Sequence, residues 1–439
     1  MNKKNYLIVL FFTVSNFVSG QEIIWSLQKC FDIALENNLD VKMKQLEISK
    51  AKKEYYTPLS NLLPSISLAG SHSYDFGSTI DPSTNGRVSS DIQYDNIYLN
   101  ADISILDFNM LATAKKNKIA IEKSKVSKVV VAYDYKMQLL ERYFEALYTQ
   151  ELVKIQKKQL INTKYNLERI DKEVTLGKKP KSDLYDIQLS YSQEEKRILE
   201  TEQLFELQKI QLFQLMNIKD EIIENVVFQP YFFNENFQEI EPFLEQNLIN
   251  NPTILLAELD YKSSLKDIAI QQASKLPSIS AYYILSSFYY NPLNQPDAAV
   301  TNFKTQIDNN KSQQVGFQLR VPVFNGFKNS KKIAASKIES ERTKLAIEQE
   351  KIKVSKQIEQ EITKQKQYLQ LKENLNTNLL LAEKSFKTTQ AKFLHNKVNA
   401  FEYTSLKNQL LTAEYNILKN DLLLQYTSLK INLLKNNTL

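Results

Sequence analysis

Side chains that commonly perform chemistry are rare in this chain. Its 439 residues contain one cysteine, Cys30, and two histidines, His72 and His395, which lie far apart in the sequence. No nucleophile motif, phosphate-binding loop or set of residues with metal-ligand spacing accompanies them. The sequence therefore predicts no enzyme, no bound cofactor and no metal site.

The N-terminus has the pattern of an export signal. Lys3 and Lys4 precede an apolar stretch at residues 6–14, and the small residues Val18-Ser19-Gly20 follow. We expect residues 1–20 to be a signal peptide that is removed. No other stretch approaches the roughly 20 apolar residues of a membrane-spanning helix. The mature protein is predicted to be exported without a helical anchor.

Cys30 has two interpretations in an exported chain. It could be a lipid-acylated cysteine, but the bulky Lys29 precedes it and it lies well past the apolar stretch. The favoured interpretation is a buried, inert thiol. A single cysteine cannot form a disulfide within the chain.

The composition favours long helices. Glycine occurs 7 times and proline 11 times, and 24% of the residues are charged. The net charge of +6 is spread along the chain without a basic block. Mixed charges of this kind are typical of exposed helix faces, and they exclude a nucleic-acid partner.

One pentapeptide occurs twice. Leu63-Pro64-Ser65-Ile66-Ser67 recurs as Leu276-Pro277-Ser278-Ile279-Ser280, an offset of 213 residues. In both copies a helical pattern precedes the pentapeptide, and a strand pattern followed by a long heptad pattern comes after it. The sequence predicts repeat one at residues 21–218, an equatorial linker at residues 219–243 and repeat two at residues 244–439.

The helical segments of the two repeats have matching lengths. We expect long helices at residues 109–175 and 329–393, each about 100 Å long at 1.5 Å per residue. Shorter helices are expected at about 28–62, 181–217, 245–275 and 401–434. The summed length of two shorter helices placed end to end equals the length of one long helix. This match indicates a wall of antiparallel helices, in which the junctions between the shorter helices lie at the level of the linker.

In each repeat, the segment between the first helix and the long helix has the alternating pattern of β-strands. The predicted β-hairpins span about residues 64–108 and 277–324, and Pro64 and Pro277 mark the entries from helix to strand. Polar and apolar residues alternate over 10 to 12 positions, close to the length of a tilted membrane strand. Two hairpins packed on a soluble core would show the same alternation. In a membrane, however, every strand edge must be paired, and four strands cannot close a barrel. Three chains would supply twelve strands.

The duplicated layout, the Leu-Pro-Ser entries and the exit at Phe324-Asn325-Gly326 resemble the outer-membrane efflux protein (TolC-like) family. The resemblance covers about residues 25–434. It implies a mainly α-helical protein with a membrane β-hairpin pair, and a homotrimer whose twelve-stranded barrel continues into a long antiparallel α-helical tunnel. It also implies a passive exit duct in the outer membrane, surrounded by outer-membrane lipid, with the helices in the periplasm. The implied partners are a periplasmic adaptor and an inner-membrane pump, for efflux or type I secretion.

The resemblance also implies a gate where the helices turn. In the family, acidic residues follow a turn glycine by six and nine positions, and here Asp183 and Asp186 follow Gly177 in this way. Repeat two has Asn396 at the turn, Glu402 as the first acid and Ser405 in place of the second. Asparagine tolerates the left-handed conformation, so we expect the turn to persist. A ring of Glu402 carboxylates in a trimer would favour cations.

Three further expectations concern the same region. Phe393 stands where the family has an aromatic gate residue that can donate a hydrogen bond, which a phenyl ring cannot. Val398 stands where a basic locking residue is expected, so we expect that lock to be absent or different. The turns at Gly177 and Asn396 are the predicted adaptor docking sites.

Two alternatives stay open at this stage. Asp183, Asp186 and Glu402 could belong to solvated helix faces. The whole chain could be an exported periplasmic coiled-coil scaffold.

Overall fold

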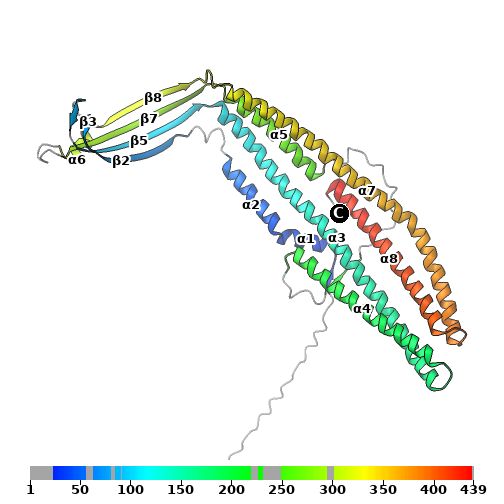
Figure 1. Ribbon diagram of the computed structural model, residues 1–439. Coiled ribbons are helices and arrows are strands. Elements are labelled where there is room, and N and C mark those ends of the chain that lie inside the picture. The colour runs from blue at the N-terminus through cyan, green and yellow to red at the C-terminus, as the bar shows by residue number, and fades with distance from the viewer. Residues whose placement is uncertain are drawn as a thin grey trace, which may run out of the picture. The chain divides into compact units, whose positions relative to one another are not determined.

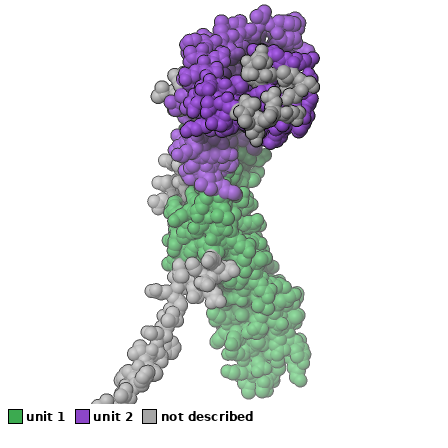
Figure 2. All heavy atoms as spheres, turned by 90° about the vertical axis from the view of Figure 1, so that its left-hand side faces the viewer, with its two compact units in different colours: residues 1–42, 131–251, 354–439 green, residues 43–130, 252–353 purple. Residues whose placement is uncertain are grey.

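A computed structural model describes residues 23–55, 63–80, 85–89, 91–218, 226–230, 248, 250–293 and 301–437. The predicted signal peptide, residues 1–20, and most of the predicted linker lie outside the described residues. The chain forms two compact units (Figure 2). Unit 1 contains residues 1–42, 131–251 and 354–439, and unit 2 contains residues 43–130 and 252–353.

The four long strands of unit 2 form one antiparallel sheet, in the order β2 (Ser65–Asp75), β5 (Ile92–Leu106), β7 (Ser278–Pro292) and β8 (Ser312–Arg320) (Figure 1). The two strands of each predicted hairpin pair with each other, β2 with β5 and β7 with β8. The pairing of β5 with β7 joins the two hairpins into one sheet. Strands β2 and β8 lie at the two edges. The connection from β2 to β5 carries the short strands β3 (Ser78–Ile80) and β4 (Arg87–Ser89), and β7 connects to β8 through α6 (Phe303–Asn309).

One face of this sheet is apolar and open. Its side chains include Ile66 and Leu68 of β2 and Val315, Phe317 and Leu319 of β8, and the last three are 77%, 77% and 65% exposed. The strand register brings Leu68, Leu99 and Leu285 into line across the sheet on this same face. A continuous apolar surface of this kind is what a membrane strand presents to lipid, and a sheet with two free edges cannot remain open there.

Proline marks each entry into the sheet. Pro64 immediately precedes β2, and Pro277 immediately precedes β7. A proline has no N–H to offer a strand ladder, so it is tolerated at the first residue of a strand or just before it. At the return to helix, the carboxylate of Asp107 accepts hydrogen bonds from the backbone N–H groups of Asn109 (2.8 Å) and Met110 (3.2 Å).

Besides the short α6, four helices contribute to unit 2. They are α2 (Leu39–Glu54), α3 (Phe108–Thr175), α5 (Pro252–Ala273) and α7 (Lys328–Leu394), although α2, α3 and α7 also have residues in unit 1. Polar contacts hold α5 between its neighbours. Lys116 on α3 forms an ion pair with Asp267 on α5 (2.6 Å), and Ser264 on α5 lies 2.9 Å from the hydroxyl of Thr343 on α7. None of the described helices has the length and hydrophobicity needed to span a membrane.

Unit 1 adds α1 (Leu27–Asn37), α4 (Lys181–Leu215) and α8 (Ala400–Asn436), together with a small parallel sheet of β1 (Ile23–Trp25) and β6 (Val226–Phe228). The sequence predicted one helix over about residues 28–62, but α1 ends at Asn37. The side chain of Asn38 accepts a hydrogen bond from the N–H of Val41 (2.9 Å), so it begins a new helix, α2. Asparagine competes for backbone hydrogen bonds in this way and favours helix ends.

The core of unit 1 surrounds this small sheet. Cys30 is fully buried there with Trp25, Phe31 and Phe213, and burial raises the pKa of its thiol to about 12. Gln150 on α3 extends the ladder of β6, because its side-chain amide both donates to the carbonyl of Phe228 (2.9 Å) and accepts from the N–H of Phe228 (2.7 Å). The buried, inert interpretation of Cys30 therefore agrees with its surroundings.

Candidate functional site

The two helix turns of unit 1 have the same backbone geometry. Gly177, between α3 and α4, has a φ of +70°, and Asn396, between α7 and α8, has a φ of +55°. The N–H of Lys178 donates to the carbonyl of Glu173 (2.8 Å), and that of Lys397 donates to the carbonyl of Lys392 (2.8 Å). These are the bonds of a Schellman motif, which requires a residue in the left-handed conformation after the helix. Glycine and asparagine are the residues that adopt it at low cost.

The second turn leads directly into α8. The side chain of Asn399 accepts a hydrogen bond from the N–H of Glu402 (2.9 Å) and thereby caps the helix. Glu402 lies in the first turn of α8 and is exposed. A carboxylate in this place is stabilised by the partial positive charge of the helix N-terminus.

Phe393 is fully buried at the centre of an aromatic and cationic cluster. Its ring stacks on Tyr403, with 4.5 Å between the ring centroids and 14° between the planes. The guanidinium of Arg169 lies 5.0 Å from the same ring and the ammonium of Lys179 lies 4.6 Å from it. Phe393 and Tyr403 come from α7 and α8, whereas Arg169 and Lys179 come from α3 and the α3–α4 turn. The cluster therefore joins the ends of both helical hairpins through cation–π contacts.

Tyr403 carries the hydroxyl that Phe393 lacks, and this hydroxyl accepts a hydrogen bond. The side-chain amide of Asn166 on α3 donates to the Tyr403 hydroxyl (2.8 Å). Burial raises the pKa of Tyr403 to about 12. The sequence reasoning missed Tyr403, although it directly follows Glu402.

The predicted carboxylates have different surroundings. Asp183 is buried and forms an ion pair with Lys179 (3.0 Å), Asp186 is half-buried, and Glu402 is exposed. Among the described residues, no hydrogen bond or ion pair connects these three carboxylates to one another. Val398, which stands where the sequence analysis expected a basic locking residue, packs against the Phe393 cluster. The basic groups that contact the Phe393 ring are Arg169 and Lys179.

A second polar cluster links α3, α4 and α8. Lys407 on α8 is fully buried and forms an ion pair with Glu194 on α4. Its ammonium also donates to the hydroxyls of Thr163 (2.8 Å) and Ser190 (3.3 Å), which in turn donate to Glu194 (2.7 and 3.0 Å). Burial lowers the pKa of Lys407, and the adjacent Glu194 opposes that shift. A buried ion pair with satisfied hydrogen bonds holds its elements in one arrangement, because withdrawing either partner leaves an unpaired buried charge.

The other helical hairpin lacks this cluster. At the 219-residue offset that relates Gly177 to Asn396, the counterparts of Thr163 and Glu194 are Ala382 and Ala413. A groove of about 520 Å³ lies there between α7 and α8, and both alanines line it. The two hairpins therefore share a turn geometry, but among the described residues only the α3–α4 hairpin is linked to α8 by a buried ion pair at this position.

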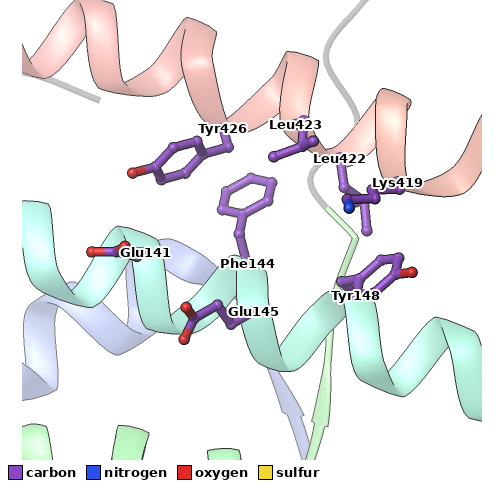
Figure 3. Close-up of a pocket in the computed structure, with 8 residues that line it drawn as sticks. All are labelled: Glu141, Phe144, Glu145, Tyr148, Lys419, Leu422, Leu423 and Tyr426. Atoms are coloured by element: carbon purple, nitrogen blue, oxygen red, sulfur yellow. The ribbon is translucent and has the colours of Figure 1, made fainter. Parts of the chain in front are cut away.

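An apolar groove of about 230 Å³ lies between α3 and α8 of unit 1 (Figure 3). The ring of Phe144 points from α3 toward Leu422, Leu423 and Tyr426 of α8, and it lies 5.8 Å from the ring of Tyr426. The charged groups of the lining are Glu141, Glu145 and Lys419. The arrangement is one of helix packing, with no nucleophile placed beside a base.

The two histidines lie in different units of the chain. The ring of His72 on β2 is hydrogen-bonded to the carboxylate of Asp95 on β5, and His395 lies in the α7–α8 turn. Within the described ranges, no group of three or more His, Cys, Asp or Glu side chains is placed to hold a metal ion.

Solved structures of outer-membrane channels have the same fold. The channel VceC of Vibrio cholerae aligns with a TM-score of 0.77 at 12% identity, over 93% of this chain and 96% of its own. CmeC of Campylobacter jejuni aligns with a TM-score of 0.77 at 15% identity, over 93% and 85%. MtrE of Neisseria gonorrhoeae aligns with a TM-score of 0.73 at 16% identity, over 94% and 89%. No curated protein sequence matches the chain.

A family model supplies the sequence-level evidence. The model of the outer membrane efflux protein family matches residues 31–217 and 243–435, which is most of the chain. The predicted fold class is confirmed, and with it the outer-membrane location and the role of exit duct in efflux. The periplasmic scaffold alternative is thereby excluded. The chain belongs to the outer membrane efflux protein family.

Proposed function

We propose that the Phe393 cluster and Glu402 together form the periplasmic gate of a homotrimeric duct. The observation that carries this proposal is the full burial of Phe393 between Tyr403 and the cations Arg169 and Lys179. These contacts fasten the end of one helical hairpin to the end of the other. A gate at this end must break them when it opens.

Glu402 supplies the charge of the proposed constriction. It is exposed in the first turn of α8, where three copies would place three carboxylates in a ring. Such a ring favours cations and opposes anions. Asp183 already pairs with Lys179, so its charge is largely neutralised, and Asp186 contributes from its half-buried position.

The same ends of the hairpins are the proposed docking surface for a periplasmic adaptor. The turns at Gly177 and Asn396 expose backbone groups, and the neighbouring Leu176 and Leu394 are exposed apolar side chains. Apolar anchors surrounded by polar groups are typical of protein interfaces. An inner-membrane pump would supply the energy for transport, and the duct itself would be passive.

Single-channel recording of Glu402→Ala in planar bilayers tests the gate. We expect a higher conductance or a weaker block by multivalent cations, because the variant removes the carboxylate ring. Glu373→Ala, which removes another exposed carboxylate from the helical part, is the matched control. Currents identical to those of the wild type would show that Glu402 does not lie at the constriction.

A further inference from the structure

The face of the sheet opposite the apolar face is mixed in chemistry. On β2 it carries Ser65, Ser67, Ala69, Ser71 and Ser73, which alternate with the outward Ile66 and Leu68. In a closed barrel of three copies, this second face lines the interior. Barrel interiors of channels are ordinarily polar and filled with water.

Aromatic rings gather on this inner face over the central strand pair β5–β7. Tyr94 lies opposite Tyr290 in the register, and its ring centroid is 5.7 Å from that of Phe288. Tyr98 lies opposite Ser286, which places it diagonally next to Phe288. Diagonal neighbours of this kind are within reach of aromatic side chains. Tyr94, Tyr98, Phe288 and Tyr290, which we call the aromatic patch, therefore form one continuous group.

A fifth inner-face aromatic, Tyr282, has a structural role. It lies directly over Gly316 of β8, where an added Cβ would come within 2.6 Å of the Tyr282 hydroxyl. Tyr282 thus fills the space above a glycine, and it is not part of the patch.

The strand next to the patch leaves its rings accessible. Ala69, Ser71 and Ser73 of β2 lie beside Tyr98, Asn96 and Tyr94, and these short side chains cannot cover the rings. All four members of the patch are half-buried, so part of each ring surface is open. Flat organic molecules can stack on such exposed rings, beside the hydroxyl groups of Ser71 and Ser73.

The inner face is poorly suited to soft metal ions. Among the residues that the structure describes on the four long strands, the inward positions hold no methionine, cysteine or histidine. The charged inward residues are Asp75, Asp102 and Arg320. Soft metal cargo would call for thioether, thiolate or imidazole ligands.

We propose that the aromatic patch binds small organic compounds that carry aromatic rings as they leave through the barrel. This inference rests on the exit-duct function and names a class of cargo for it. Binding is transient, because a duct must release what it binds, and it comes from ring stacking with an added cation–π contribution for aromatic cations.

The test compares two monovalent cations of similar size in single-channel recordings of the whole protein. Tetraphenylphosphonium carries aromatic rings and tetrabutylammonium carries none, and each is added on the barrel side. We expect tetraphenylphosphonium to block at a lower concentration. Tyr98→Ser should raise its half-blocking concentration by about two- to tenfold, which corresponds to the loss of one aromatic contact. Tetrabutylammonium block should stay unchanged.

Two further variants keep the test decisive. Tyr98→Trp enlarges the patch and should strengthen tetraphenylphosphonium block, so the proposal can fail even if the serine variant does not fold. Asn100→Ser, on the same face of β5, is the matched control and should behave like the wild type. Equal block by both cations in a conducting wild-type channel, or block that is unaffected by either Tyr98 variant, would overturn the aromatic patch while leaving the duct intact. A folded protein that neither assembles into trimers nor conducts would contradict the duct itself.

Discussion

At the end of the α7–α8 hairpin, the buried ring and the hydroxyl that the family resemblance expects in one residue belong to two residues. Phe393 provides the buried ring and Tyr403 provides the hydroxyl, which Asn166 engages. The sequence pattern indicated Phe393 because its position is fixed relative to the turn at Asn396. It could not indicate Tyr403, Arg169 or Lys179 as partners, because these contacts depend on how α3 packs against α8.

Burial of the Tyr403 hydroxyl predicts a dependence of stability on alkaline pH. The unfolded chain releases this proton near the ordinary tyrosine pKa of 10.0, whereas the folded chain holds it until about 12. The folded state therefore binds more protons in this window, and the free energy of unfolding must fall as the pH rises through it. Below pH 10 the contribution is complete.

Unfolding midpoints measured between pH 9 and 12 check this prediction. Tyr403→Phe should flatten the decline above pH 10, because the titrating group is gone. Tyr185→Phe, which removes the hydroxyl of an exposed tyrosine, should leave the decline unchanged. The burial of Tyr403 would be in doubt if the two variants gave the same slope.

At the scale of helices, the buried pair of Lys407 and Glu194 distinguishes the two halves of the chain. The repeats agree in their turns, their helix lengths and their strand entries, and these features follow from glycine, asparagine, proline and periodicity. The pair itself could not be predicted, because a lysine and a glutamate 213 residues apart look like ordinary surface residues in a chain that is 24% charged. The same holds for Gln150, whose amide completes the ladder of β6.

Removing Lys407 should strongly destabilise the helical part. Lys407→Met leaves Glu194 buried without its cation, which we expect to cost about 3–5 kcal/mol of unfolding free energy. The double variant Lys407→Met/Glu194→Leu should regain most of that loss, because no charge is then left unpaired. Denaturant unfolding in detergent measures both.

An exposed ion pair provides the comparison. Lys196 and Glu200 lie 3.6 Å apart on α4 with both side chains largely exposed. Lys196→Met should change the unfolding free energy by less than about 1 kcal/mol. If Lys407→Met behaved like Lys196→Met, the buried pair would not hold the helices together.

At the scale of the whole molecule, much of the fold was predictable. The alternation of polar and apolar residues indicated two hairpins, whose strands pair as expected. The heptad patterns indicated two long helices, and the duplicated pentapeptide indicated that the layout is repeated. The sequence did not predict that the first helix is divided at Asn38 into α1 and α2. It also did not predict that β1 pairs with β6. The first depends on a single asparagine side chain, and the second joins two three-residue strands about 200 residues apart.

Closure of the barrel is the central claim at this scale. Each chain supplies four strands with an exposed apolar face and two edges, β2 and β8. Native mass spectrometry of the protein extracted from outer membranes in detergent tests the claim most directly. We predict a single species containing three chains. A monomer that stays soluble without detergent would contradict it.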